Sequence, residues 1–116
     1  MTGLPSIEDT LREIVELLVG GDYAGLERRT NGVRLSAKEM ESAIVDYGRT
    51  LVFPPADAFL DIDVIPVRSS SPPSYSVRFT LYTHEEGRSD LELQATLGEG
   101  TEETRMSVEI DNILVA

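Results

Sequence analysis

The spacing of apolar residues changes once along this chain, and this change constrains the fold more than any other feature. Up to about residue 50, apolar side chains recur every three or four positions, the period of an amphipathic helix. From residue 59 onward they alternate with polar side chains, the period of a strand with one face in solvent. The sequence therefore predicts helices followed by strands, packed together as an α+β fold.

Three helices are predicted in the N-terminal part. The first begins after Ser6, where a hydroxyl can cap the free N–H groups. A second, shorter helix follows Asp22 and extends to about residue 30. The third begins at Ser36, which has capping-box spacing to Glu39, and it ends at Gly48.

Four strands are predicted in the C-terminal part, after a Pro-Pro connector that is incompatible with helix. They centre on residues 60–64, 77–81, 91–97 and 106–110, with turns at residues 85–88 and 98–101. After Asp111 and Asn112 the apolar phase shifts to Ile113 and Val115, which predicts a β-bulge.

We expect residues 1–116 to form a single domain, since a chain of this length has room for one core. Residues 1–50 would supply three helices, packed on one face of a four-stranded antiparallel meander formed by residues 59–116. The other face of the sheet would be polar and exposed.

Composition excludes several classes of function. The formal charge of −11 argues against nucleic-acid binding, because phosphates would be repelled. No cysteine is present and only one histidine, which excludes disulfide, thiolate-zinc and multi-histidine sites. No signal-like or membrane-spanning apolar segment is found, so we expect a cytoplasmic protein without a membrane partner and without a cofactor.

Three segments carry a family resemblance: residues 17–26 (LLVGGDYAGL), residues 81–91 (LYTHEEGRSDL) and residues 108–113 (VEIDNI). The first resembles the junction between the first two helices of cystatin-like and NTF2-like folds. The other two resemble an uncharacterised bacterial domain family of actinobacterial type. The resemblance implies a two-layer fold and a lineage, and no activity. The chain departs from NTF2-like enzymes because the inward positions of its last three strands are almost all apolar.

His84 and Asp90 are the strongest catalytic candidates, because an imidazole beside carboxylates can transfer protons. A solvated hairpin tip explains the same residues, and no nucleophile or oxyanion donor accompanies them. We therefore favour a protein without enzymatic activity.

Three further sites are weaker. Asp61 and Asp63 could bind magnesium or calcium with Glu109 or Asp111, although acids on a wet strand are common, and we expect no metal. Aromatic residues could line a small-molecule cavity, although their spacing also fits a packed core; they are Tyr23, Phe53, Phe59, Tyr75 and Phe79. Arg28, Arg29 and Arg34 form the only local basic cluster, which we interpret as salt-bridging surface with phosphate binding as the alternative.

Acidity, small size and the missing catalytic set favour a non-enzymatic protein-binding module for a basic protein, such as an immunity or antitoxin-like protein. The residues expected to bind the partner lie on the outer sheet face and its rim: Tyr82, Glu85, Glu86, Glu92, Glu109 and Asp111. Two alternatives remain: an NTF2-like ligand-binding protein or enzyme with a pocket between helices and sheet, and a structural homodimer.

Overall fold

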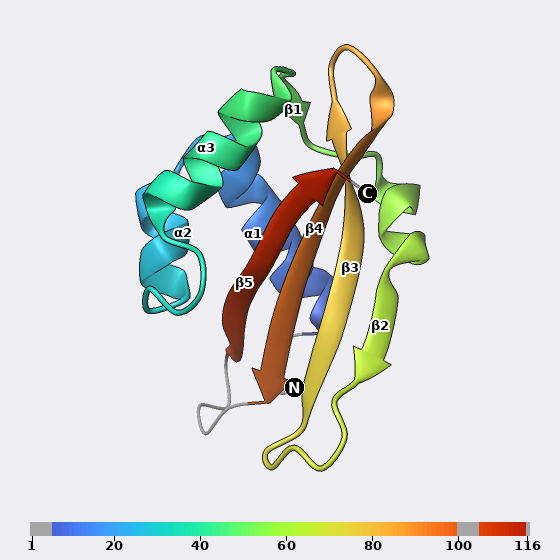
Figure 1. The fold of residues 1–116 in the computed structure, drawn as a ribbon. Coiled ribbons are helices and arrows are strands. Elements are labelled where there is room, and N and C mark those ends of the chain that lie inside the picture. Colours follow the sequence, from blue (N-terminus) through green and yellow to red (C-terminus); the bar gives the residue numbers. More distant parts are fainter. Residues whose placement is uncertain (1–5, 100–104, 116) are drawn as a thin grey trace.

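The computed structural model describes residues 6–99 and 105–115, and it has an α+β architecture (Figure 1). Three α-helices come first, followed by five strands and one 3₁₀ helix. In chain order the elements are α1 (Ile7–Val19), α2 (Tyr23–Arg29), α3 (Ala37–Tyr47), β1 (Leu51–Val52), η1 (Ala56–Asp61), β2 (Asp63–Pro66), β3 (Ser74–Thr83), β4 (Gly87–Glu99) and β5 (Met106–Val115). The turn predicted at residues 98–101 lies partly outside the described residues.

The three helices begin where the sequence predicts. The side chains of Ser6 and Asp22 accept hydrogen bonds from N–H groups in the first turns of α1 and α2. Ser36 and Glu39 form the complete reciprocal capping box of α3. Gly48, with φ 76°, ends α3 in the left-handed conformation that glycine adopts without steric cost.

All strand pairs in the sheet are antiparallel. The main order is β1-β3-β4-β5, and β2 also pairs with β3. Val52 pairs with Tyr82 near one end of β3, whereas Asp63 pairs with Arg78 further along the same edge. The two short strands therefore share one edge of β3, and β5 lies at the opposite edge of the sheet.

The strand predicted at residues 60–64 is wrong in its first half. Residues 56–61 form η1, in which Phe59 is buried and Leu60 is 80% exposed. The Phe59 ring stacks on Phe79 with 4.9 Å between the centroids. An extended segment with Leu60 and Ile62 inward would turn Phe59 to the opposite face, so burial of the larger ring overrides the alternation.

The bulge predicted near Asp111 is confirmed. Gln94 pairs with Asn112 and Ala95 pairs with Ile110, which leaves Asp111 as the extra residue. A second irregularity lies in β4, where Thr80 pairs with Glu92 but Tyr82 pairs with Arg88. The Ser89 hydroxyl fills this gap, since it donates to the Leu81 carbonyl at 2.7 Å and accepts from the Leu91 N–H.

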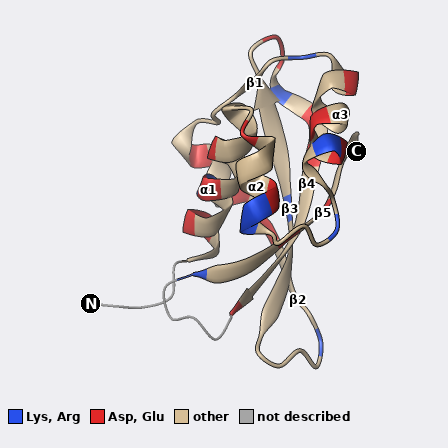
Figure 2. Ribbon diagram, turned by 90° about the vertical axis from the view of Figure 1, so that its left-hand side faces the viewer, with Lys and Arg blue, Asp and Glu red and all other residues tan. Residues whose placement is uncertain are grey.

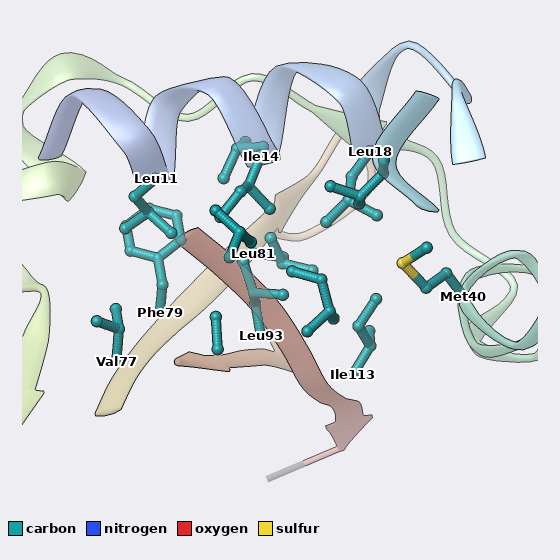
Figure 3. Packing of buried hydrophobic residues seen from close by; sticks show 14 of the residues in the cluster. Leu11, Ile14, Leu18, Met40, Val77, Phe79, Leu81, Leu93 and Ile113 are labelled. Carbon is teal, nitrogen blue, oxygen red and sulfur yellow. The ribbon is translucent and has the colours of Figure 1, made fainter. Parts of the chain in front are cut away.

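The hydrophobic core lies between the helices and one face of the sheet (Figure 3). Leu11, Ile14 and Leu18 project from α1 toward Phe79, Leu81 and Leu93, all of them buried. Met40 from α3 extends the same layer toward Ile113 of β5. The space between the two layers is thus filled with side chains. Among the described residues, no helix combines the length and apolarity needed to cross a membrane.

Candidate functional site

The hairpin between β3 and β4 is tied to the end of α3 by its acidic side chains. The Glu85 carboxylate accepts from the Thr50 N–H at 2.8 Å and from the Thr50 hydroxyl at 2.9 Å. The Glu86 carboxylate accepts from the hydroxyls of Tyr47, at 2.8 Å, and Thr83, at 3.0 Å. Two of the predicted partner-binding residues are therefore already engaged within the chain.

His84 and Asp90 lie in the same hairpin, and both are exposed. Their backbone N–H groups form hydrogen bonds with the region after α3 and with α3 itself. The His84 N–H donates to the Thr50 carbonyl at 2.8 Å, and the Asp90 N–H donates to the Tyr47 hydroxyl at 3.2 Å. Neither side chain lines the two larger pockets described below. The hydrogen bond from the Thr50 N–H holds the pKa of Glu85 below its usual value. The geometry here is that of a docked turn.

The outer sheet face holds the other predicted binding residues: Tyr82, Glu92, Glu109 and Asp111. Glu92 accepts from the Gln94 amide at 2.9 Å. Arg34, from the α2–α3 connection, reaches Glu109 at 3.4 Å and Asp111 at 3.5 Å. Asp111 also accepts from the Thr96 hydroxyl at 2.7 Å. The carboxylates on this face are thus partly neutralised by neighbours within the chain.

The carboxylates proposed for a metal site do not meet. Asp63 lies on β2 and Asp111 on β5, with β3 and β4 between them. Three strand spacings separate such positions by about 14 Å, far beyond any coordination distance. Within residues 6–99 and 105–115, no group of three or more potential ligands is positioned to hold a metal ion.

The aromatic residues proposed to line a cavity instead pack together or lie apart. Phe53 tilts against Phe59 at 5.7 Å, and the Arg12 guanidinium sits 4.2 Å from the centre of the Phe59 ring. Tyr75 donates to Glu99 at 2.9 Å, and this hydrogen bond raises the pKa of Tyr75. These contacts and their burial assign Phe59 and Phe79 to the core, whereas Phe53 remains 42% exposed.

A pocket of about 450 Å³ lies between the end of α2 and the start of β5. Arg28, Arg29 and Arg105 line it, together with Asn31 and Ser107. Sequence proximity had grouped Arg28 and Arg29 with Arg34. The fold separates Arg34, which turns toward Glu109 and Asp111, and it adds Arg105 from a position 76 residues further along.

A second pocket, of about 500 Å³, lies between α3 and the end of β5. It is a shallow groove lined by Leu35, Ala43 and Ile113, with Glu39 and Asp46 among its polar residues. The Glu39 carboxylate is used in the capping box, where it accepts from the Ser36 N–H at 2.9 Å. Asp46 is exposed.

The helices carry many acidic residues (Figure 2). α1 carries four acidic residues and one arginine, and α3 carries three acidic residues and one lysine. Asp9, Glu16, Glu41 and Asp46 are exposed and have no ion-pair partner in the part of the chain that the structure describes. Burial raises the pKa of Tyr23, and the charge of the nearby Glu41 raises it further.

The sequence of this chain matches one known family model. The model of a domain of unknown function, DUF7668, matches residues 15–116. The chain belongs to the DUF7668 family. Comparison with curated proteins and with solved structures gave no match.

The DUF7668 match covers α2, α3, the whole sheet and the last five residues of α1. It therefore includes the hairpin, the groove beside α3 and the arginine-lined pocket. The match confirms the predicted membership in a domain family of unknown function.

Sequence reasoning missed two features of this DUF7668 chain. The local sequence does not indicate that Arg105 and Arg28 line the same pocket, because their proximity depends on the packing of β5 beside α2. The engagement of Glu85 and Glu86 was also missed. Thr50 and Tyr47, the residues that bind them, are 35 and 39 positions away in the sequence.

Proposed function

We propose that the domain is a non-enzymatic protein-binding module that takes a basic protein partner. The observation that carries this proposal is the set of exposed acidic side chains on α1 and α3 that lack a partner among the described residues: Asp9, Glu16, Glu41 and Asp46. Carboxylates in this state keep their charge for an incoming cation, and they accelerate the encounter with a basic surface.

The helices are a better interface than the sheet face favoured by the sequence. The carboxylates of Glu92, Glu109 and Asp111 all accept hydrogen bonds or pair with Arg34, so a partner would have to replace those contacts. On α3, by contrast, Val45 is 65% exposed, one turn after Glu41 and adjacent to Asp46. An apolar side chain beside free carboxylates is a common composition for a binding surface.

An immunity or antitoxin-like role is the concrete form of this proposal, with a basic toxin as partner. The two-layer arrangement of helices on one sheet face also supports a cystatin-like or NTF2-like relationship. The NTF2-like alternative of a ligand site inside the fold has little support, since Leu11, Ile14 and Leu18 fill the space against the sheet.

The test compares two charge-reversal variants of equal charge change. Glu41→Lys with Asp46→Lys alters the helical surface, and Asp63→Lys with Glu92→Lys alters the outer sheet face as the matched control. Partners are captured from lysate of the native cells at low salt and at about 0.5 M salt, and the retained protein is identified and titrated.

We expect a basic protein that is retained at low salt and weakened at high salt. The helical variant should lower its affinity at least about tenfold, whereas the sheet variant should leave it within about twofold. If only the sheet variant loses affinity for the partner, the interface would instead include Glu92 and its neighbours. Failure to retain any basic protein would overturn the proposal, and a doubled solution mass would then favour the homodimer.

A further inference from the structure

We propose that the pocket between α2 and β5 binds a small ligand through a phosphate or carboxylate group. Its walls are the last turn of α2, the turn at residues 30–33 and the first half of β5. Its volume of about 450 Å³ lies within the range of small-molecule sites. None of the acidic residues proposed to bind a protein partner (Asp9, Glu16, Glu41 and Asp46) lines this pocket, so the inference does not rest on that partner.

Positive charge is concentrated in this pocket, although the chain as a whole is negatively charged. The whole chain has ten basic residues and 21 acidic ones. Three of the ten, Arg28, Arg29 and Arg105, line this one pocket. Arg28 and Arg29 lie in the last turn of α2, and Figure 2 shows basic residues on this helix in blue. A helix C-terminus favours arginine, which accounts for Arg28 and Arg29 but not for Arg105.

Among the described residues, one carboxylate, that of Glu13, forms ion pairs with these arginines. Glu13 Oε2 accepts from Arg29 Nε and from an Arg105 terminal nitrogen, both at 2.9 Å. Glu109 also lines the pocket, but its charge is paired with Arg34 at 3.4 Å. Arg28 is exposed, and no ion pair joins it to any residue in the ranges 6–99 and 105–115. The pocket therefore retains positive charge that an anion can neutralise.

Arg29 makes the pocket rigid. Its side chain is only 9% exposed, and a terminal nitrogen donates to the Met106 carbonyl at 2.7 Å. This bond fixes the first residue of β5 against the last turn of α2. The guanidinium groups of Arg28 and Arg105 are thus carried on two segments whose separation is set by a nearly buried contact.

The edge of β5 that faces away from β4 adds backbone groups to the pocket. The Met106 carbonyl faces Arg29, and the Ile110 carbonyl accepts from the Leu35 N–H at 3.3 Å, so both point away from β4. Backbone groups alternate in direction along a strand, which turns the N–H and carbonyl of Val108 to the same side. Val108 lines the pocket, and its N–H is a donor of the kind that binds oxyanions.

The test titrates two probes, inorganic phosphate and succinate, at constant ionic strength set with sodium chloride. Binding is followed by amide chemical shifts of Asn31, Ser107 and Val108, and by the thermal unfolding midpoint. The pocket variant is Arg28→Gln with Arg105→Gln, two exposed side chains whose loss leaves Arg29 in place. Arg49→Gln with Arg78→Gln removes the same charge outside the pocket and serves as control.

Saturable shifts at Val108 and Asn31 are expected in the native protein and in the control. The pocket variant should bind at least about tenfold more weakly, the loss expected when a charge-assisted hydrogen bond is removed. Saturation by phosphate alone assigns a phosphorylated ligand, and saturation by succinate alone assigns a carboxylate. Shifts that do not saturate with either probe, or equal weakening in the control, would overturn the proposal.

Discussion

The hairpin at residues 84–90 and the pocket between α2 and β5 are both clusters of charged side chains, and they are assembled in opposite ways. The hairpin residues are contiguous, and Glu85 and Glu86 accept four hydrogen bonds from Thr50, Tyr47 and Thr83. The pocket joins positions 28, 29 and 105, where three guanidinium groups line one opening.

In the hairpin the charged side chains stabilise the fold, whereas in the pocket part of the charge remains available to bind a ligand. A turn exposes backbone N–H groups, and nearby carboxylates satisfy them, so its acidic residues are consumed locally. In the pocket Arg29 binds the Met106 carbonyl and shares Glu13 with the more exposed Arg105, whereas Arg28 has no ion-pair partner among the described residues. The contiguous cluster is hydrogen-bonded within the chain, and the more open cluster comes from distant segments.

The largest expected effect comes from the strand that supports both regions. Leu93 of β4 is buried and pairs with Phe79 and Ile113 on either side. Leu93→Ala should lower the free energy of unfolding by about 2–5 kcal/mol, measured by urea denaturation. Leu114→Ala, at an exposed position on β5, is the control with little change expected. Equal values would mean that β4 is not the common scaffold.

Variants of Arg29 and Arg28 test whether one of these neighbouring arginines stabilises the fold while the other is available to bind a ligand. Arg29→Met removes bonds to Glu13 and to the Met106 carbonyl, and we expect a loss of about 1.5–3 kcal/mol in unfolding free energy. Arg28→Met should change stability by less than about 0.5 kcal/mol, because the side chain is exposed. If both variants unfold alike, the assignment of Arg28 to ligand binding loses its basis.

Tyr47 makes the corresponding test in the hairpin. Its hydroxyl donates to Glu86 and accepts from the Asp90 N–H, so Tyr47→Phe should cost about 0.5–1.5 kcal/mol. Amide exchange at Asp90 should become faster in the same variant. Tyr82→Phe is the matched control, since the Tyr82 hydroxyl has no hydrogen-bond partner within the described ranges. Unchanged exchange at Asp90 would contradict the docking of the hairpin on α3.

The fold was largely predictable because its signals are local. The caps at Ser6, Asp22 and Ser36 and the bulge at Asp111 all depend on residues within a few positions of one another. The segment at residues 56–61 was mispredicted because burial of Phe59 against Phe79 is a long-range contact. The same limit applies to the candidate sites.

The sites depend on which distant segments meet. Arg105 reaches Glu13 across 92 positions, and no spacing rule connects them. A basic cluster was visible at Arg28 and Arg29, and its membership was decided only by the packing of β5 beside α2. Whether a carboxylate is free also depends on tertiary contacts, as the bonds from Thr50 to Glu85 demonstrate.

The smallest expected effect is a pH dependence of the hairpin. Hydrogen bonds from Thr50 lower the pKa of Glu85 in the folded protein below the value of 4.5 for a free glutamate. The folded state then binds fewer protons than the unfolded state, so this stabilisation is complete above pH 4.5 and is lost as the pH falls through the lowered pKa. Glu85→Gln should flatten the fall of the unfolding midpoint in acid, measured by thermal unfolding of the variant and of the native protein. Identical slopes in the two proteins would show that the Glu85 carboxylate adds nothing to the hairpin, and its charge would then be as free as those of the helices.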